Sequence, residues 1–486
     1  MVRNHPAAGQ QTSRALALLA WMVLVAHRGF EPLISALRGR CPGPLDECAV
    51  PLRIAKERPS GQGSGRPAGI TAGGLVAVVV AAALATACDS GTKKPPATGP
   101  LTPELSAVMD QVSALRGLPA AKDVRAGTIT QEQVPAALEA TLTGADEESF
   151  AHLTTLYRLL GHLGPNEYYK GAYLAFAGGN VIGFYSPKQK ALYVVTADGK
   201  PVEFSSLEIL ERSTIAHELT HALQDHSFDV QSLLEKTRGD LDWSLALTSV
   251  IEGDAVNIEG TWRRDHTLQP VAPRVMLASL TQTQSTPVSI EREFRFPYTN
   301  GAEWVSIVRT QRGNDAIDAV LNGRRLTTAE IIHPDLYDAG FTPDRVTVPD
   351  LTKALGNGWK HESGGAFGEF QLRNYLQLEL TALPATQAAT GWRGDRYDVY
   401  MKGNDAVAAF HIRFASAEEA QGFASAQGAF FNAANATVTD NDGRWVAVFP
   451  DGRTTIRAGT SGPDVVFVIG ANRKVAEAAF AALAGG

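Results

Sequence analysis

The stretch that decides the expected fold is residues 214–226, which read T-I-A-H-E-L-T-H-A-L-Q-D-H. Apolar residues at positions 215, 219 and 223 recur every four residues and predict an amphipathic helix. His217 and His221 are also four residues apart, so a helix places both imidazoles on one face. Glu218 directly follows the first histidine and is therefore within reach of whatever the two imidazoles bind.

This spacing, His-Glu-x-x-His, predicts a zinc site. Two imidazoles can bind one Zn²⁺ ion, and zinc lowers the pKa of a bound water to near neutral. A carboxylate beside the metal can then accept a proton from that water, so that a hydroxide attacks a carbonyl carbon. We predict one Zn²⁺ ion as cofactor, His217 and His221 as ligands, and Glu218 as the general base. The alternative interpretation is an amphipathic helix with two solvent-facing histidines.

A catalytic zinc site also needs a third protein ligand. A histidine six residues after His221 would match the metzincin pattern, but that position is Ser227. Glu252 lies in the next predicted helix, among apolar residues, where a carboxylate is costly unless it is paired or bound to a metal. We predict Glu252 as the third ligand, with Gly253 allowing its helix to pack closely on the helix of residues 214–226. The competing candidates are Asp225, Asp254, Glu259 and His266.

The segments AHELTHALQDH (216–226) and VIEGDA (250–255) together resemble the zincin-like gluzincin metallopeptidases, and more closely a group of bacterial secreted peptidases. Other segments share this resemblance: GFYSPKQKALYVV at 183–195, FPYTNG at 296–301, His333-Pro334, and GWRGDRY at 391–397. The resemblance covers residues 105–485. It implies a peptidase with an α+β fold, in which a mostly helical zincin-like catalytic domain contains a small sheet.

The resemblance also implies roles for residues outside the motif. The best-known gluzincins place an Asp four residues after the third ligand, where it orients a zinc-binding histidine. Here that position is Val256, and the nearest acids are Asp254 and Glu259. A ligating imidazole needs its other N–H held, and of the two acids we expect Asp254 to supply the carboxylate. The segment 191–195 would be a sheet edge that holds an extended peptide, or else an ordinary core strand. The candidates for stabilising an oxyanion are Tyr298, His333, His361 and Tyr397.

Local patterns predict the other elements. Residues 101–163 have helical periodicity, whereas residues 172–196 are predicted to form strands, with a turn at SPKQK (186–190). Ser205 and Glu208 have the spacing of a capping box and predict the start of the helix that carries the histidines. Residues 241–262 are predicted to form the next long helix.

The C-terminal residues change character again. From residue 396, strand-like segments alternate with helical ones near 416–431 and 471–484, which predicts a small α+β module. We therefore divide the chain into five segments. They are a spurious or disordered extension (1–55), a signal peptide ending in a lipobox (56–87), a flexible tether (88–100), the zincin-like metallopeptidase domain (101–388) and the C-terminal α+β module (389–486).

The N-terminal residues predict export. Residues 68–87 carry no charge, follow a basic stretch and end at Cys88, which is typical of a secretory signal. The segment 85–88, Ala-Thr-Ala-Cys, resembles a bacterial lipobox, in which the cysteine is lipidated. We expect a lipoprotein anchored at Cys88 to the outer face of the cell membrane. The alternative is a single-pass signal anchor, since about 20 apolar residues can span a bilayer.

Composition narrows the expected partners. The chain has 44 Lys and Arg against 51 Asp and Glu, a formal net charge of −7, with no basic domain. This balance argues against a nucleic-acid partner. We expect a peptide or protein substrate, and contact with the membrane through the lipid. Two functions fit: a zinc-dependent peptidase, or a non-enzymatic surface lipoprotein that uses a zincin fold for binding or structure. Glu218 separates them, because a general base has no role in a purely structural site.

Overall fold

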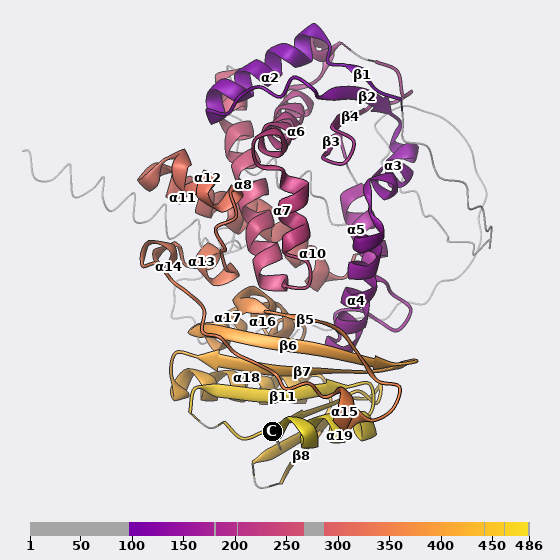
Figure 1. Ribbon diagram of the computed structural model, residues 1–486, viewed down its shortest axis with the longest axis vertical. Coiled ribbons are helices and arrows are strands. Elements are labelled where there is room, and N and C mark those ends of the chain that lie inside the picture. The colour runs from indigo at the N-terminus through magenta and orange to yellow at the C-terminus, as the bar shows by residue number, and fades with distance from the viewer. Residues whose placement is uncertain are drawn as a thin grey trace, which may run out of the picture. The chain divides into compact units, whose positions relative to one another are not determined.

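The computed structural model describes residues 97–178, 181–201, 203–266, 286–441, 443–460 and 462–484 (Figure 1). Residues Asp89–Gly486 form one compact unit. The predicted N-terminal extension, signal peptide and lipidation residue Cys88 lie outside the described residues. None of the described helices is both long and apolar enough to cross a membrane. The predicted tether of residues 88–100 is corrected at its end, because Gly99–Pro100 forms strand β1.

The first part of the compact unit is mainly helical. Its helices are α2 (Pro103–Arg116), α3 (Val134–Thr141), α4 (Gly144–Leu160), α5 (Tyr169–Gly178), α6 (Ile209–Phe228), α7 (Val230–Lys236), α8 (Leu241–Asp265), α10 (Val288–Phe296), α11 (Ala302–Arg312), α12 (Asn314–Leu321), α13 (Thr328–Ile332) and α14 (Pro334–Asp338). Shorter turns are η1 (Gln131–Gln133), η2 (Phe204–Ser206) and the π-helical segment η3 (Pro297–Gly301). The prediction of strands from residue 172 was wrong up to residue 178, because short apolar runs do not distinguish a strand from a buried helix.

A small sheet lies beside these helices. Its strands are β1 (Gly99–Pro100), β2 (Arg125–Ile129), β3 (Gly183–Ser186) and β4 (Ala191–Val195), in the order β1-β2-β4-β3. The predicted hairpin is confirmed, since β3 and β4 pair antiparallel across the turn. However, β4 also pairs parallel with β2, so it is an inner strand. The expectation of a sheet edge at 191–195 is therefore corrected, and the edge strand is β3.

Helix α6 carries the predicted motif. Its buried residues Ile215, Leu219 and Leu223 pack in one core cluster with residues of α2, β4 and α8. The capping box at its start is formed by Glu208 and Glu211, whereas Ser205 lies in the preceding turn η2. The N-cap residue of α6 is therefore Glu208 and not the predicted Ser205, because the residues of η2 precede the helix.

The C-terminal part is built on a second, antiparallel sheet. Its strands are β5 (Lys360–Gly365), β6 (Trp392–Lys402), β7 (Asp405–Phe414), β8 (Thr437–Asn441), β9 (Arg444–Val448), β10 (Thr454–Arg457) and β11 (Asp464–Gly470), in the order β5-β6-β7-β11-β10-β9-β8. Its helices are α15 (Thr352–Leu355), α16 (Gly368–Leu376), α17 (Ala382–Ala389), α18 (Ala417–Ala433) and α19 (Arg473–Ala484). The predicted boundary at residues 388/389 is corrected, because β5 precedes it and belongs to this sheet.

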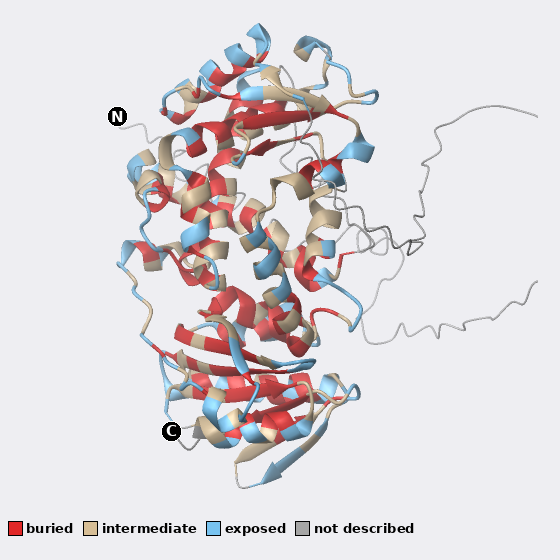
Figure 2. Cartoon of the chain, turned by 45° about the vertical axis from the view of Figure 1, so that its right-hand side comes forward, coloured by how far each residue is buried: buried red, intermediate tan, exposed pale blue. Residues whose placement is uncertain are grey.

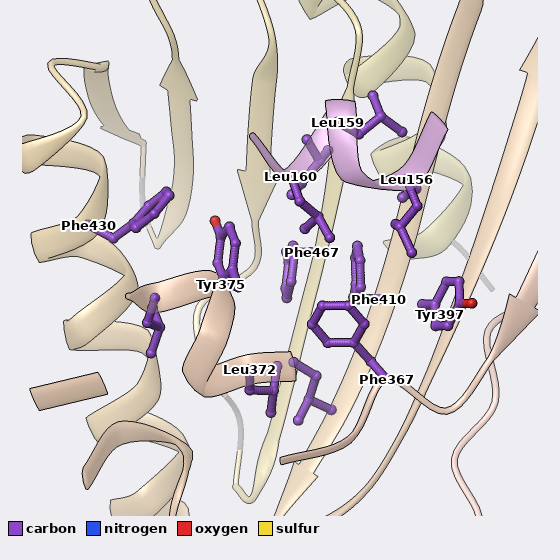
Figure 3. Close-up of a cluster of buried hydrophobic side chains, with 14 of the residues drawn as sticks. Leu156, Leu159, Leu160, Phe367, Leu372, Tyr375, Tyr397, Phe410, Phe430 and Phe467 are labelled. Carbon is purple, nitrogen blue, oxygen red and sulfur yellow. The ribbon is translucent and has the colours of Figure 1, made fainter. Parts of the chain in front are cut away.

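The second sheet shares its core with the helical part. Phe410 of β7 and Phe467 of β11 are cross-strand partners whose rings stack with centroids 4.6 Å apart. Leu156 and Leu160 of α4 belong to the same buried cluster (Figure 3). Buried residues follow the inner strands and helix faces in both parts (Figure 2). The second sheet therefore packs directly on α4, a helix that also lines the cleft described below.

Candidate metal centre

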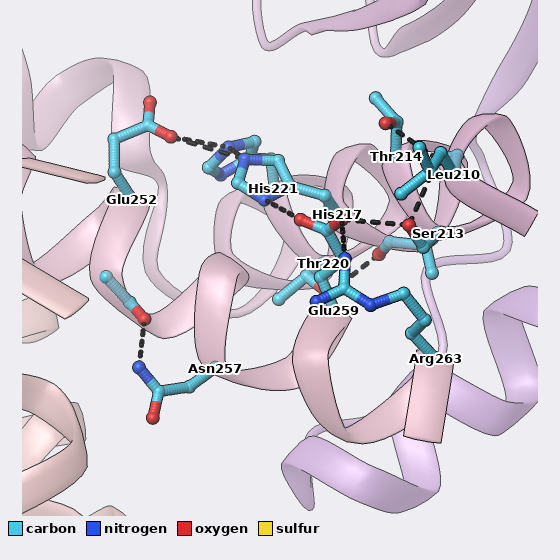
Figure 4. Close-up of polar contacts among 12 residues, drawn as sticks. Leu210, Ser213, Thr214, His217, Thr220, His221, Glu252, Asn257, Glu259 and Arg263 are labelled. Atoms are coloured by element: carbon cyan, nitrogen blue, oxygen red, sulfur yellow. Dashed lines mark hydrogen bonds and ion pairs between the residues drawn. The ribbon is translucent and has the colours of Figure 1, made fainter. Parts of the chain in front are cut away.

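Three side chains predicted as zinc ligands converge between α6 and α8. His217 Nε2 lies 3.1 Å from His221 Nε2, and Glu252 Oε2 lies 3.3 Å from each of these nitrogens. Figure 4 shows the carboxylate of Glu252 turned toward both rings. Within the described part of the chain, these residues are the group arranged to hold a metal ion. The tertiary structure therefore brings together the two local histidines and a glutamate from a different helix.

The separations of these three atoms fit zinc. An ion with tetrahedral geometry and ligand bonds of about 2.0–2.1 Å separates its ligand atoms by about 3.3–3.4 Å. The observed separations of 3.1–3.3 Å between Nε2, Nε2 and Oε2 are close to this value. Two imidazoles and one carboxylate are also a donor set that zinc accepts in catalytic sites, where a fourth position stays open. The residues present therefore fit one zinc ion.

The close approach of these groups changes their titration. Burial would raise the pKa of Glu252, but the neighbouring His221 and His217 lower it below its ordinary value. Burial would lower the pKa of both histidines, but Glu252 raises it in each case. A negative charge is thus stabilised at Glu252 in buried surroundings, which suits a ligand for a cation.

Glu218 lies in the same cleft as the triad. One of its oxygens, Oε2, accepts a hydrogen bond of 2.8 Å from the backbone N–H of Tyr185 on the edge strand β3. Burial raises the pKa of Glu218, although the two imidazoles act in the opposite direction. The first sheet therefore has a definite role, because its edge holds the predicted general base in place.

Glu252 faces the histidines because α8 packs against α6. Gly253 has a different role from the predicted one. A Cβ atom at Gly253 would lie 2.4 Å from the backbone oxygen of Gly301, so the close approach is between α8 and η3. Asn257 strengthens this contact, since its Nδ2 donates to the backbone oxygen of Ala302 at 2.9 Å. The packing thus places η3, and Tyr298 on it, beside the triad.

The carboxylate beside His217 is Glu259, which corrects the prediction for Asp254. Glu259 Oε2 lies 3.3 Å from His217 Nδ1, at ion-pair distance but without the alignment of a full hydrogen bond. Seven residues make almost two turns of a helix, so Glu259 shares a face with Glu252. Asp254, two residues after Glu252, projects from the opposite side of α8. There it accepts a hydrogen bond from Gln224.

Sequence reasoning missed Gln224. This residue is fully buried on α6, and its Oε1 lies 2.9 Å from His221 Nδ1. Gln224 follows His221 by three residues, which places the two side chains on adjacent turns of the same helix face. Helical spacing from the ligands could have identified both Gln224 and Glu259.

Two of the competing ligand candidates, Asp225 and His266, contact other residues. Asp225 is buried and accepts from Tyr185 Oη at 2.8 Å and from Lys190 Nζ at 2.6 Å. His266 Nδ1 contacts the backbone oxygen of Trp262 at 2.7 Å. Each of these residues has a structural partner away from the triad.

Among the oxyanion candidates, Tyr298 is the one next to the triad. Its ring stacks on that of His217 with centroids 6.3 Å apart, and its hydroxyl faces Glu252. Tyr397 lines the cleft, but its hydroxyl donates to the backbone oxygen of Gly239 at 3.2 Å. His333 pairs with Glu369, and His361 with Asp398.

A cleft of about 700 Å³ opens onto the triad and Glu218. Strand β3, helices α6 to α8, and helices α4, α5 and α10 all contribute residues to its lining. The last three supply half-buried aromatic rings: Phe150, Tyr173, Phe176 and Phe294. Neighbouring rings touch, with centroids 5.1–6.1 Å apart. We call these four residues the aromatic wall.

Comparison with known proteins gives a match in the C-terminal part of the chain. Residues 358–479, which are 122 of the 486 residues, match a domain of unknown function (DUF8575). This region contains the second sheet from β5 to β11 and lies outside the histidine motif. No curated protein and no solved structure matches the chain significantly.

Proposed function

We propose that this protein is a zinc-dependent peptidase, with His217, His221 and Glu252 as metal ligands and Glu218 as the general base. The observation that carries the proposal is the convergence of three ligand atoms at 3.1–3.3 Å, close to the spacing that tetrahedral zinc requires. The presence of Glu218 in the same cleft supports catalysis over a purely structural site. In line with the sequence, we further propose that Cys88 is lipidated and anchors the exported protein to the outer face of the cell membrane.

Each residue then has a chemical task. Zinc supplies Lewis-acid activation of a carbonyl and of a water molecule at neutral pH. Glu218 accepts the proton of the attacking water as its oxygen forms a bond to the carbonyl carbon. The carbon–nitrogen bond breaks when Glu218 returns that proton to the leaving amine. The Tyr185 N–H keeps the carboxylate oriented during both transfers.

The first prediction concerns the metal. We expect the purified protein to bind one zinc ion per chain, and to cleave peptides of a mixed library only in the zinc-loaded form. A chelator should abolish cleavage and added zinc should restore it, because the three ligands are brought together by the fold. Metal analysis by mass spectrometry and a chromatographic cleavage assay measure both. A protein that retains no zinc, or that cleaves nothing when zinc-loaded, would contradict the proposal.

The aromatic wall supports peptides with a large apolar side chain as substrates. Phe294 lies four residues before Tyr298, about one helical turn along the chain, and both residues line the cleft. Residues of an extended peptide are spaced by about 3.3–3.6 Å. A side chain close to the cleaved bond can therefore reach the wall and bury its apolar surface there.

The second prediction tests this preference. We expect Phe176→Ala to lower kcat/KM by about 10-fold or more for a peptide with Phe or Leu beside the bond, because buried aromatic contact is lost. Peptides with Gly at that position should be affected far less. Tyr168→Ala is the matched control, since Tyr168 is 62% exposed and outside the cleft lining. Equal losses for Gly and Phe peptides would show that the wall does not select substrates.

A further inference from the structure

We infer that Gln224 is a positioning residue, which fixes the protonation of the His221 ring so that Nε2 is the nitrogen available to a metal. The inference rests on the proposed zinc site and concerns how tightly that site holds its ion. Gln224 is fully buried, and three hydrogen bonds connect its side-chain amide to α8 and to His221. Each of the three partners constrains which way the amide can face.

The orientation of the Gln224 amide follows from its neighbours on α8. Its Nε2 lies 3.0 Å from the backbone oxygen of Ile251 and 2.9 Å from Asp254 Oδ2. Both partners accept hydrogen bonds, so the amide must present its two N–H groups to them. Its oxygen Oε1 is then the atom that faces His221 Nδ1 at 2.9 Å. The reverse orientation would place two acceptors against the amide oxygen.

An amide oxygen can only accept, so His221 Nδ1 must carry a proton to make this bond. In a neutral imidazole, the other nitrogen is then unprotonated. That nitrogen, Nε2, lies 3.1 Å from His217 Nε2 and 3.3 Å from Glu252 Oε2, at the place where the ligand atoms converge. Gln224 thus aims the lone pair of His221 into the candidate metal centre.

Asp254 is itself held by two arginines from other helices. Arg116 of α2 is fully buried, and its Nε donates to Asp254 Oδ2 at 2.7 Å. Arg309 of α11 forms an ion pair with the other oxygen, Oδ1. A carboxylate that accepts hydrogen bonds from two guanidinium groups can act toward Gln224 only as an acceptor. The orientation of a zinc ligand on α6 therefore depends on charges contributed by α2, α8 and α11.

A purely structural role for Gln224 predicts a different outcome. If the amide only joined α6 to α8, its removal would lower the free energy of unfolding and leave the zinc affinity of the folded protein unchanged. If Gln224 positions His221, the zinc dissociation constant itself must change. The partners of metal-binding histidines typically contribute about 10–100-fold to metal affinity.

The test uses the purified protein and zinc as the probe. We expect Gln224→Met, which keeps the volume but removes the acceptor, to weaken zinc binding about 10–100-fold in competition with a chromogenic chelator. Gln427→Met is the matched control, because Gln427 of α18 is equally buried and far along the chain. Its zinc affinity should not change.

Three outcomes have distinct meanings. Wild-type zinc affinity in folded Gln224→Met overturns the inference and leaves the proposed function standing. A wild-type protein that does not bind zinc contradicts the proposed function instead. Should Gln224→Met fail to fold, nitrogen-15 NMR of the zinc-loaded wild type decides: we expect a His221 Nδ1–H proton protected from exchange, and its absence overturns the inference.

Discussion

We expect the Glu218→Gln variant to bind zinc as tightly as the wild type and to lose hydrolysis by a factor of about 10²–10⁴. The amide keeps the shape of the side chain but cannot accept a proton from water. Zinc binding should persist because the proposed ligand atoms belong to His217, His221 and Glu252. Metal content and initial rates on the same peptide, measured on the same preparations, check both parts.

The control for this variant is Glu211→Gln on the same helix. Glu211 caps the start of α6, where glutamine serves equally well, so zinc content and rate should both match the wild type. If Glu218→Gln hydrolyses peptides as fast as the wild type, Glu218 is not the base. If neither protein hydrolyses any peptide although both bind zinc, the non-enzymatic surface module becomes the better interpretation.

We expect Glu252→Ala to lower zinc affinity by more than about 100-fold and to abolish hydrolysis. Loss of an outer partner of a ligand already costs about 10–100-fold, and Glu252 is itself a predicted ligand. Without its carboxylate, the chain offers the metal two imidazoles, whereas catalytic zinc sites take three protein ligands. Chelator competition and the peptide assay measure the two effects.

Asp225→Asn provides the matched comparison for Glu252→Ala. Asp225 is a buried carboxylate four residues after His221, but it pairs with Lys190 and Tyr185 and not with the two histidines. We expect this variant to retain zinc and activity, with any loss confined to the free energy of unfolding. Full zinc occupancy of Glu252→Ala at limiting metal would refute the assignment of the third ligand, and the site would have to be rebuilt around another acid.

Some of the site could be predicted from the sequence, because its geometry is local. His217, Glu218 and His221 lie within one helix, where a spacing of four residues fixes a shared face regardless of what surrounds it. The long helix that carries Glu252 also has a strong local pattern and was predicted over nearly its full length. The apolar surroundings of Glu252 already indicated a carboxylate that needs a partner.

Other features were decided by tertiary packing. The edge strand of the first sheet is β3 and not β4, because β4 pairs on its other side with β2, a strand distant in sequence. The second sheet begins with β5, before the predicted boundary, because β5 pairs with β6 across two helices. Strand order depends on such long-range pairing, and a local pattern of apolar residues does not contain it.

The sequence by itself determined which histidines could bind a metal together, since helical periodicity places the two imidazoles on one face with Glu218 beside them. Only the tertiary structure decided which face of α8 is turned toward them. Glu252 and Glu259 share a face of α8, whereas Asp254 projects from the opposite side toward Gln224 and Arg116. That choice depends on the rotation of α8 about its own axis, which is set by its packing against α6 and η3. A rotation of one helix relative to another is a property of the packed core, so no single segment encodes it.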